Sequence, residues 1–167
     1  MPLSGPVSAP SFDELLVRLV RADVRFVLIG GLALGSWGVI RGTKDCDIVP
    51  DPAPENLNRL AELAAELGGH VQLGDSLLGS ERSIAALLAG EERALISTQL
   101  GDLDVVQGLE GVPAYGELRT RAIDVELSGV TIAICALDDL RRMKRAAGRP
   151  RDLVDLDDLD AAQPGPS

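Results

Sequence analysis

The residues most able to do chemistry are two aspartates, Asp45 and Asp47, which lie two positions apart in a run typical of a β-strand. Side chains two apart on a strand project from the same face, with Cα atoms roughly 6 to 7 Å apart, and Cys46 between them points the other way. Two carboxylates about 4 Å apart repel each other by about 4 kcal/mol at an effective dielectric of about 20. A divalent cation that prefers oxygen ligands would remove this repulsion, so the pair predicts a metal site.

The Asp-x-Asp spacing alone does not single out this pair. Four such pairs occur, at 45/47, 102/104, 155/157 and 158/160, whereas roughly 1.5 are expected by chance from the composition. We expect Asp102 to lie in a loop or on the opposite strand face. We expect the acidic residues from 155 to 160 to form a solvated helix face, pairing with Arg149 or Arg151 where the spacing allows.

Two glycines precede the aspartates and strengthen the case for Asp45 and Asp47. Gly30 and Gly31 follow the strand-like segment 24–29 and open a short helical segment. Glycines at such a junction leave backbone N–H groups accessible, and a helix N-terminus favours an anion. This order predicts a phosphate beside the divalent cation, although a simple tight turn is the alternative. A dinucleotide-binding loop is disfavoured, because Gly30, Gly31 and Gly35 do not fit GxGxxG.

Asp104 is the candidate for a third carboxylate. It stands among apolar residues in the strand-like segment 103–106, where an unpaired carboxylate is costly to bury. If this segment lies beside 45–49, three carboxylates converge and can hold two metal ions. The third carboxylate can then accept a proton from an attacking hydroxyl.

Hydrophobic periodicity predicts a single domain of α/β or α+β class, with a small mixed β-sheet flanked by helices. The expected helices are 11–22, 31–39, 55–67, 115–122, 137–147 and 150–161. The expected strands are 24–29, 45–49, 70–73, 95–100, 103–106, 123–127 and 130–135. The domain is expected to span 11–161, between a flexible N-terminal tail at 1–10 and a flexible C-terminal tail at 162–167.

Composition narrows the classes of function. The 167 residues are 46% hydrophobic and 25% charged, an ordinary globular mix, and their net charge of −10 argues against coating nucleic acid by bulk electrostatics. No segment has the pattern of a signal peptide or a membrane span, so we expect a cytoplasmic protein without a membrane partner. The chain has one histidine, His70, and two cysteines, Cys46 and Cys135, which disfavours a zinc site. We assign all three residues to packing or surface roles.

The segment Gly30 to Val49, GGLALGSWGVIRGTKDCDIV, resembles the nucleotidyltransferase core of the polymerase-beta superfamily. The matching residues are Gly30, Gly31, Ala33, Arg41, Thr43, Asp45 and Asp47. The segment 142–156, RMKRAAGRPRDLVDL, resembles the ending of stand-alone bacterial members, including abortive-infection and toxin-antitoxin types. Minimal antitoxin-like members have Gly-Ser at the turn and Ser before the Asp pair, where Gly31 and Lys44 stand here, and this difference disfavours an antitoxin.

The resemblance implies the nucleotidyltransferase fold and a magnesium-dependent reaction. A nucleoside monophosphate would move from a nucleoside triphosphate such as ATP to an acceptor hydroxyl, with release of pyrophosphate. Asp45, Asp47 and Asp104 would bind one or two Mg²⁺ ions, and Asp104 would also act as general base.

The remaining candidate residues concern the nucleotide. The resemblance implies that Gly30 and Gly31 hold the triphosphate. The further cofactor-binding candidates are Arg41, Thr43, Lys144 and Arg149, whose basic members would steady the phosphates.

The acceptor is left open among an RNA end, a protein side chain and a small molecule. One hypothesis is the toxin-like component of a toxin-antitoxin pair, which implies a cognate partner protein. A second is a lincosamide-type antibiotic nucleotidyltransferase, which the same glycine and aspartate pattern also resembles. A third is a catalytically inactive binding module that keeps the fold.

Overall fold

A computed structural model describes residues 10–164 of the chain. The helices are α1 (Phe12–Arg21), α2 (Gly30–Ser36), α3 (Pro54–Glu66), α4 (Glu81–Gly90), α5 (Tyr115–Arg121), α6 (Leu137–Ala147) and α7 (Pro150–Ala162). The strands are β1 (Phe26–Ile29), β2 (Asp45–Pro50), β3 (Val71–Leu73), β4 (Ser76–Leu78), β5 (Arg93–Thr98), β6 (Gly101–Val106), β7 (Ile123–Leu127) and β8 (Val130–Ile134). The expected N-terminal tail lies outside the described residues except for its last residue.

The main sheet has six strands in the order β5-β6-β2-β1-β8-β7 and is mixed. Its third strand, β2, pairs antiparallel with β1 and parallel with β6. The predicted adjacency of 45–49 and 103–106 is therefore confirmed. The hairpin of β3 and β4 forms a separate two-stranded sheet.

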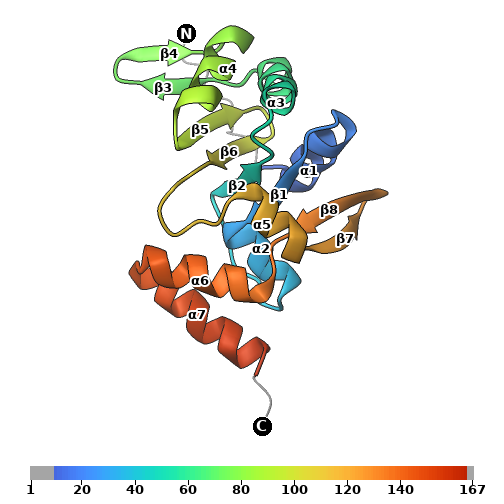
Figure 1. Ribbon diagram of the computed structural model, residues 1–167, viewed down its shortest axis with the longest axis vertical. Helices are drawn as coiled ribbons and strands as arrows, with labels where there is room; N and C mark the ends of the chain where they lie inside the picture. The colour runs from blue at the N-terminus through green and yellow to red at the C-terminus, as the bar shows by residue number, and fades with distance from the viewer. Residues whose placement is uncertain (1–9, 165–167) are drawn as a thin grey trace, which may run out of the picture.

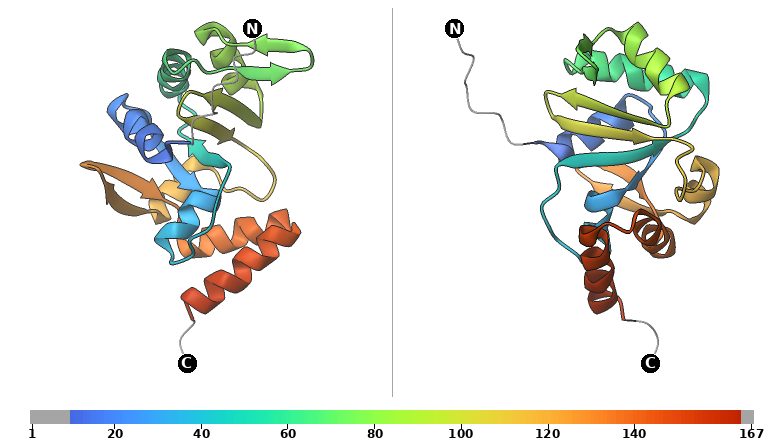
Figure 2. Two further views of the ribbon diagram at one scale, coloured as in Figure 1. Left: turned by 180° about the vertical axis from the view of Figure 1, so that it is seen from behind. Right: turned by 90° about the vertical axis from the view of Figure 1, so that its left-hand side faces the viewer.

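The sheet lies between two groups of elements (Figure 1). The helices α6 and α7 pack together at one end of the molecule, and α3, α4 and the β3–β4 hairpin lie at the other, as both views in Figure 2 also show. On β2, Cys46 and Ile48 are fully buried in the core, whereas the aspartates that alternate with them face the site. Within residues 10–164 no helix is long and apolar enough to span a bilayer.

The α6–α7 junction is set by local backbone chemistry. Gly148 ends α6 in the left-handed conformation at φ 59°, which glycine adopts without steric penalty. Pro150 opens α7, where its fixed φ suits the first helical turn and its missing N–H costs nothing. The two helices therefore turn back on one another over a very short link.

Several element boundaries differ from expectation. The strand β5 begins at Arg93 rather than at residue 95, because the exposed, charged side chain of Arg93 masks the strand pattern. The strand β4 at 76–78 was not predicted. The helix α4 lies in a segment for which no helix was expected. At the other end, α7 runs to Ala162 and the amide of Gln163 donates to the Trp37 carbonyl at 3.1 Å, so these two residues belong to the fold rather than to a tail.

Asn56 is the buried polar residue that fastens α3 to the sheet, and its removal tests this packing. Its side chain accepts from the Arg25 amide at 2.7 Å and donates to the carbonyls of Arg25 and Asp51, both at 2.9 Å. Because Asn56→Ala leaves these backbone groups without partners, we expect it to lower the free energy of unfolding by about 2 to 3 kcal/mol in urea titrations. Asn58→Ala, on the exposed face of the same helix, is the matched control and should change it little.

Candidate active site

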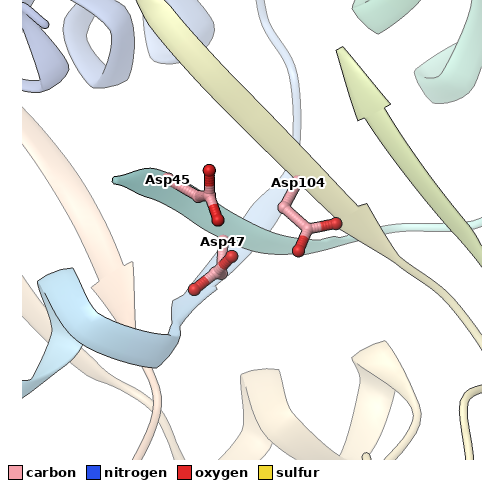
Figure 3. A group of neighbouring side chains, drawn as sticks. All are labelled: Asp45, Asp47 and Asp104. Atoms are coloured by element: carbon pink, nitrogen blue, oxygen red, sulfur yellow. The ribbon is translucent and has the colours of Figure 1, made fainter. Parts of the chain in front are cut away.

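Three carboxylates converge at the centre of the sheet. In the parallel β2–β6 ladder Asp47 stands opposite Asp104, and Asp45 lies two residues before Asp47 on the same face. One oxygen from each of the three carboxylates lies within 4.8 Å of the others (Figure 3). Asp104 is buried, whereas Asp45 and Asp47 are partly exposed. The structure thus brings together the three aspartates that the sequence singled out.

The two glycines at the β1–α2 junction give these side chains their space. Gly30 has φ 71°, and a Cβ built on it would lie 2.0 Å from Oδ2 of Asp47. A Cβ on Gly31 would lie 2.7 Å from Oγ1 of Thr43, whose hydroxyl donates to the Asp45 carbonyl at 3.1 Å. The glycines are therefore required by close approach of site residues, beyond the turn itself.

All nine predicted site residues line one cavity of about 300 Å³. The cavity is bordered by the three aspartates, by both glycines, and by Thr43 with the three basic candidates Arg41, Lys144 and Arg149. Sequence analysis missed three further charged lining residues, Arg93, Arg151 and Asp152. An apolar wall completes it, formed by Ile29, Val106, Leu109, Val112, Leu140, Met143 and Ala147.

Arg93 contacts the triad directly. It lies on β5, beside β6, and its Nε and Nη2 donate to the carboxylate of Asp104 at 3.0 and 2.6 Å. The side chain of Arg93 is 56% exposed, whereas that of Asp104 is 3% exposed. The alternation of side chains along the strand could have indicated Arg93 from the sequence. If β5 is taken to begin two residues earlier than predicted, Arg93 lies on the same strand face as Leu95.

The three basic candidates are held by two buried aspartates of α7. Arg41 donates to Asp155 through Nε and Nη2 at 2.7 and 2.9 Å, and Lys144 lies 2.9 Å from Asp155 and 3.3 Å from Asp152. Arg149 donates to Asp152 at 2.7 Å. The expected solvated helix face is therefore wrong for Asp155, because α7 packs that side against α6 and the loop before β2.

Two other expectations about acidic residues are resolved. Asp157, Asp158 and Asp160 are exposed as expected. Asp102 is neither in a loop nor on the opposite face, because β6 begins at Gly101 and places it opposite Asp45 in the ladder. It shares the face of Asp104, yet it is not among the residues that line the cavity.

The electrostatics of the triad favour a cation. Burial, together with the neighbouring charges of Asp104 and Asp45, raises the pKa of Asp47 to about 7. Burial and the charges of Asp104 and Asp102 also raise the pKa of Asp45. Protons or metal ions are therefore needed to relieve the crowded negative charge.

The donor set fits a hard divalent cation. Carboxylate oxygens are the ligands that Mg²⁺ prefers, and they come here from two adjacent strands whose register fixes their separation. Among the described residues, no histidine belongs to this cluster. The thiol of Cys46, between the two aspartates, is buried on the other face of β2. Softer metals therefore have no matching ligands in this group.

Comparison with known proteins identifies the fold. No family model matches the sequence, and no curated protein matches it. Solved structures do match over most of the chain, and they are nucleotidyltransferases. The chain therefore has the nucleotidyltransferase fold, as the resemblance in the sequence implied.

Three of these solved structures show how closely the fold of this chain is matched. The lincosamide antibiotic adenylyltransferase LnuA, solved with lincomycin bound, is 14% identical with a TM-score of 0.60, over 92% of this chain and 96% of that one. The antibiotic-resistance factor ANT(2'')-Ia is 13% identical with a TM-score of 0.59, over 90% and 81%. A candidate nucleotidyltransferase of Thermotoga maritima, TM1012, is 16% identical with a TM-score of 0.53, over 88% of each chain.

Replacing Gly30 tests whether the glycine makes room for Asp47. Gly30→Ala would combine a left-handed backbone with a Cβ that overlaps the carboxylate. We expect it to lower the free energy of unfolding by about 2 kcal/mol or more. Gly35→Ala in the same helix meets nothing within 4 Å and should raise stability by up to about 1 kcal/mol. Equal effects of the two changes in denaturant titrations would contradict this assignment.

The raised pKa of Asp47 predicts how the stability of the metal-free protein depends on pH. The folded state holds the proton up to a pKa of about 7, against an ordinary value of 3.8. The free energy of unfolding should therefore fall as pH rises from about 4 to about 7, by at most about 1.4 kcal/mol per pH unit.

This fall can be separated from the effect of other carboxylates. Hydrogen bonds and neighbouring cations lower the pKa of Asp51, Asp152 and Asp155, so these groups change stability below about pH 4. The raised pKa of Asp45 acts in the same direction as that of Asp47 and accounts for the fall that remains when Asp47 is replaced. Thermal melts from pH 4 to 8 in a chelator should show the fall in the wild type and a much smaller one in Asp47→Asn. Identical profiles would show that Asp47 is not the titrating group.

Proposed function

We propose that the protein is a magnesium-dependent nucleotidyltransferase that moves a nucleoside monophosphate from a nucleoside triphosphate to an acceptor hydroxyl. The observation that carries this proposal is the convergence of Asp45, Asp47 and Asp104 beside Gly30. It occurs in a fold shared with solved nucleotidyltransferases. Their low sequence identity means that the chemistry is inferred from the site itself.

The triad supplies the metal ligands and the base. Asp45 and Asp47 would hold Mg²⁺ together with Asp104, and when bound the metal supplies charge stabilisation for the phosphates. Asp104 would accept the proton of the acceptor hydroxyl. The acceptor oxygen then forms a bond to the α-phosphorus as the bond from that phosphorus to the bridging oxygen breaks, and pyrophosphate leaves.

The basic wall suits the triphosphate. Arg41, Lys144 and Arg149 line the cavity and are held by Asp152, which also lines it, and by Asp155, which does not. Three cations against two carboxylates leave positive charge facing the cavity, and the ion pairs fix the cations before the substrate arrives. Gly30 and Gly31 border the same space without side chains to obstruct it.

The apolar wall suits a nucleobase. The described aromatic residues do not line the cavity, whose apolar surface is aliphatic and includes Leu109, Val112 and Met143. Such a surface accepts the flat face of a base through dispersion contacts and exclusion of water. It does not distinguish one base from another, so we propose no base preference.

A small-molecule hydroxyl is the acceptor that the comparisons support best. LnuA was solved with lincomycin and ANT(2'')-Ia is an antibiotic-resistance factor. An RNA end or a protein side chain remains the other acceptor class, and a toxin-like role with a cognate partner protein stays a prediction. Labelled nucleoside triphosphates, incubated with a panel of antibiotics, total RNA and cell lysate, would distinguish these acceptors and would leave every one unlabelled for an inactive binding module.

Substitution in the triad tests the chemistry. Asp45→Asn or Asp47→Asn should reduce label transfer at least about a hundredfold, because a lost metal ligand removes several kcal/mol of stabilisation. Both should also abolish the rise in melting temperature that Mg²⁺ and nucleoside triphosphate give the wild type. Asp102→Asn is the matched control, because it lies on the same sheet face without lining the cavity. Transfer that survives in Asp47→Asn would contradict the proposal.

A further inference from the structure

The contact between Arg93 and Asp104 occupies the carboxylate that the proposed metal site needs. Nε of Arg93 donates to Oδ1 and Oδ2 of Asp104 at 3.1 and 3.0 Å, and Nη2 donates to Oδ2 at 2.6 Å. Both oxygens therefore have a cationic partner from this chain. A metal ion that binds an oxygen of Asp104 would share the carboxylate with this fork, and the guanidinium charge would repel it.

The two partners differ in their freedom to move. Asp104 is fixed in the middle of β6, between β2 and β5, and its side chain is almost fully buried. Arg93 is the first residue of β5, and more than half of its side chain is exposed. The guanidinium can leave, whereas the carboxylate cannot.

The structure also offers a place for the released guanidinium. Arg93 borders a second hollow, of about 460 Å³, on the outer side of β5. This hollow is lined by the exposed carboxylate of Glu91 and by polar and apolar side chains that include Gln72, Leu73 and Ser97. Arg93 and Glu91 both line this hollow, so it contains an acidic side chain other than Asp104 toward which the guanidinium could turn.

We propose that Arg93 is a latch on the metal site: it pairs with Asp104 in the metal-free protein, and it swings toward the hollow lined by Glu91 when a divalent cation binds that carboxylate. This inference rests on the proposed metal site. Its consequence is that the cation binds less tightly than the three carboxylates alone would allow, because each binding event breaks a bidentate ion pair. The affinity for the divalent cation therefore depends on how readily Arg93 exchanges Asp104 for Glu91 as its partner.

The test is metal affinity in the absence of nucleotide. Mn²⁺ binding to the full chain, followed by the loss of the free-ion paramagnetic resonance signal and by calorimetry with Mg²⁺, should be about tenfold tighter in Arg93→Gln than in the wild type. Arg93→Lys keeps the charge but cannot form the fork, so its affinity should lie between the two. Metal-free Arg93→Gln should melt at a lower temperature than the wild type, and saturating Mg²⁺ should raise its melting temperature by more.

A second ion pair between an arginine and a buried aspartate, outside the cavity, provides a matched control. Arg121 donates through Nε and Nη2 to the buried Asp139 at 2.8 and 3.0 Å, and its side chain is 42% exposed. Arg121→Gln therefore removes the same charge and the same type of ion pair outside the cavity. It should leave the affinity for Mn²⁺ unchanged, which separates the latch from the general effect of net charge.

The outcomes distinguish the latch from the proposed function. Equal or weaker Mn²⁺ binding in Arg93→Gln, with wild-type binding that Asp45→Asn abolishes, overturns the latch and leaves the metal site standing. The same tightening in Arg121→Gln also overturns the latch. Absence of Mn²⁺ binding in both the wild type and Arg93→Gln overturns the latch together with the metal site.

Discussion

Mutual repulsion among three carboxylates is the constraint on which the rest of the site depends. The register of β2 with β6 brings Asp45, Asp47 and Asp104 together. Two features of the structure offset the resulting repulsion. Asp47 binds its proton more tightly than an ordinary aspartate. Asp104 is neutralised by Arg93. Grouping these carboxylates lowers the stability of the folded protein, so the arrangement indicates a functional site that binds a cation.

A second set of buried charges joins the C-terminal helices to the sheet. Asp152 and Asp155 are fully buried on α7, and buried ion pairs of this kind contribute little net stability compared with apolar packing. Their value lies in position, because they orient Arg41, Lys144 and Arg149 along one wall of the cavity. The motif-like segment at the end of the chain is thus part of the site, although it is more than 90 residues from the Asp pair in sequence.

The sequence predicted what depends on local spacing and missed what depends on which strands become neighbours. The Asp-x-Asp pair, the diglycine junction and the apolar setting of Asp104 were all visible, because each is a pattern within a few residues. Arg93 was not, because its role exists only once β5 folds back beside β6. Asp155 likewise looked like one more residue of an acidic helix, and only the packing of α7 against α6 shows it to be buried. Residues whose partners are far away in sequence carry no local signature of the pairing.

The distribution of charge narrows the substrates that this site can accept. The chain as a whole carries a net charge of −10, yet five basic side chains, Arg41, Arg93, Lys144, Arg149 and Arg151, line the cavity with four aspartates. With the buried Asp155, which pairs with Arg41 and Lys144, the charges at the cavity nearly balance, so a triphosphate meets less repulsion there than a long nucleic acid would meet from the acidic chain as a whole. The same reasoning favours a compact acceptor that presents its hydroxyl at the cavity.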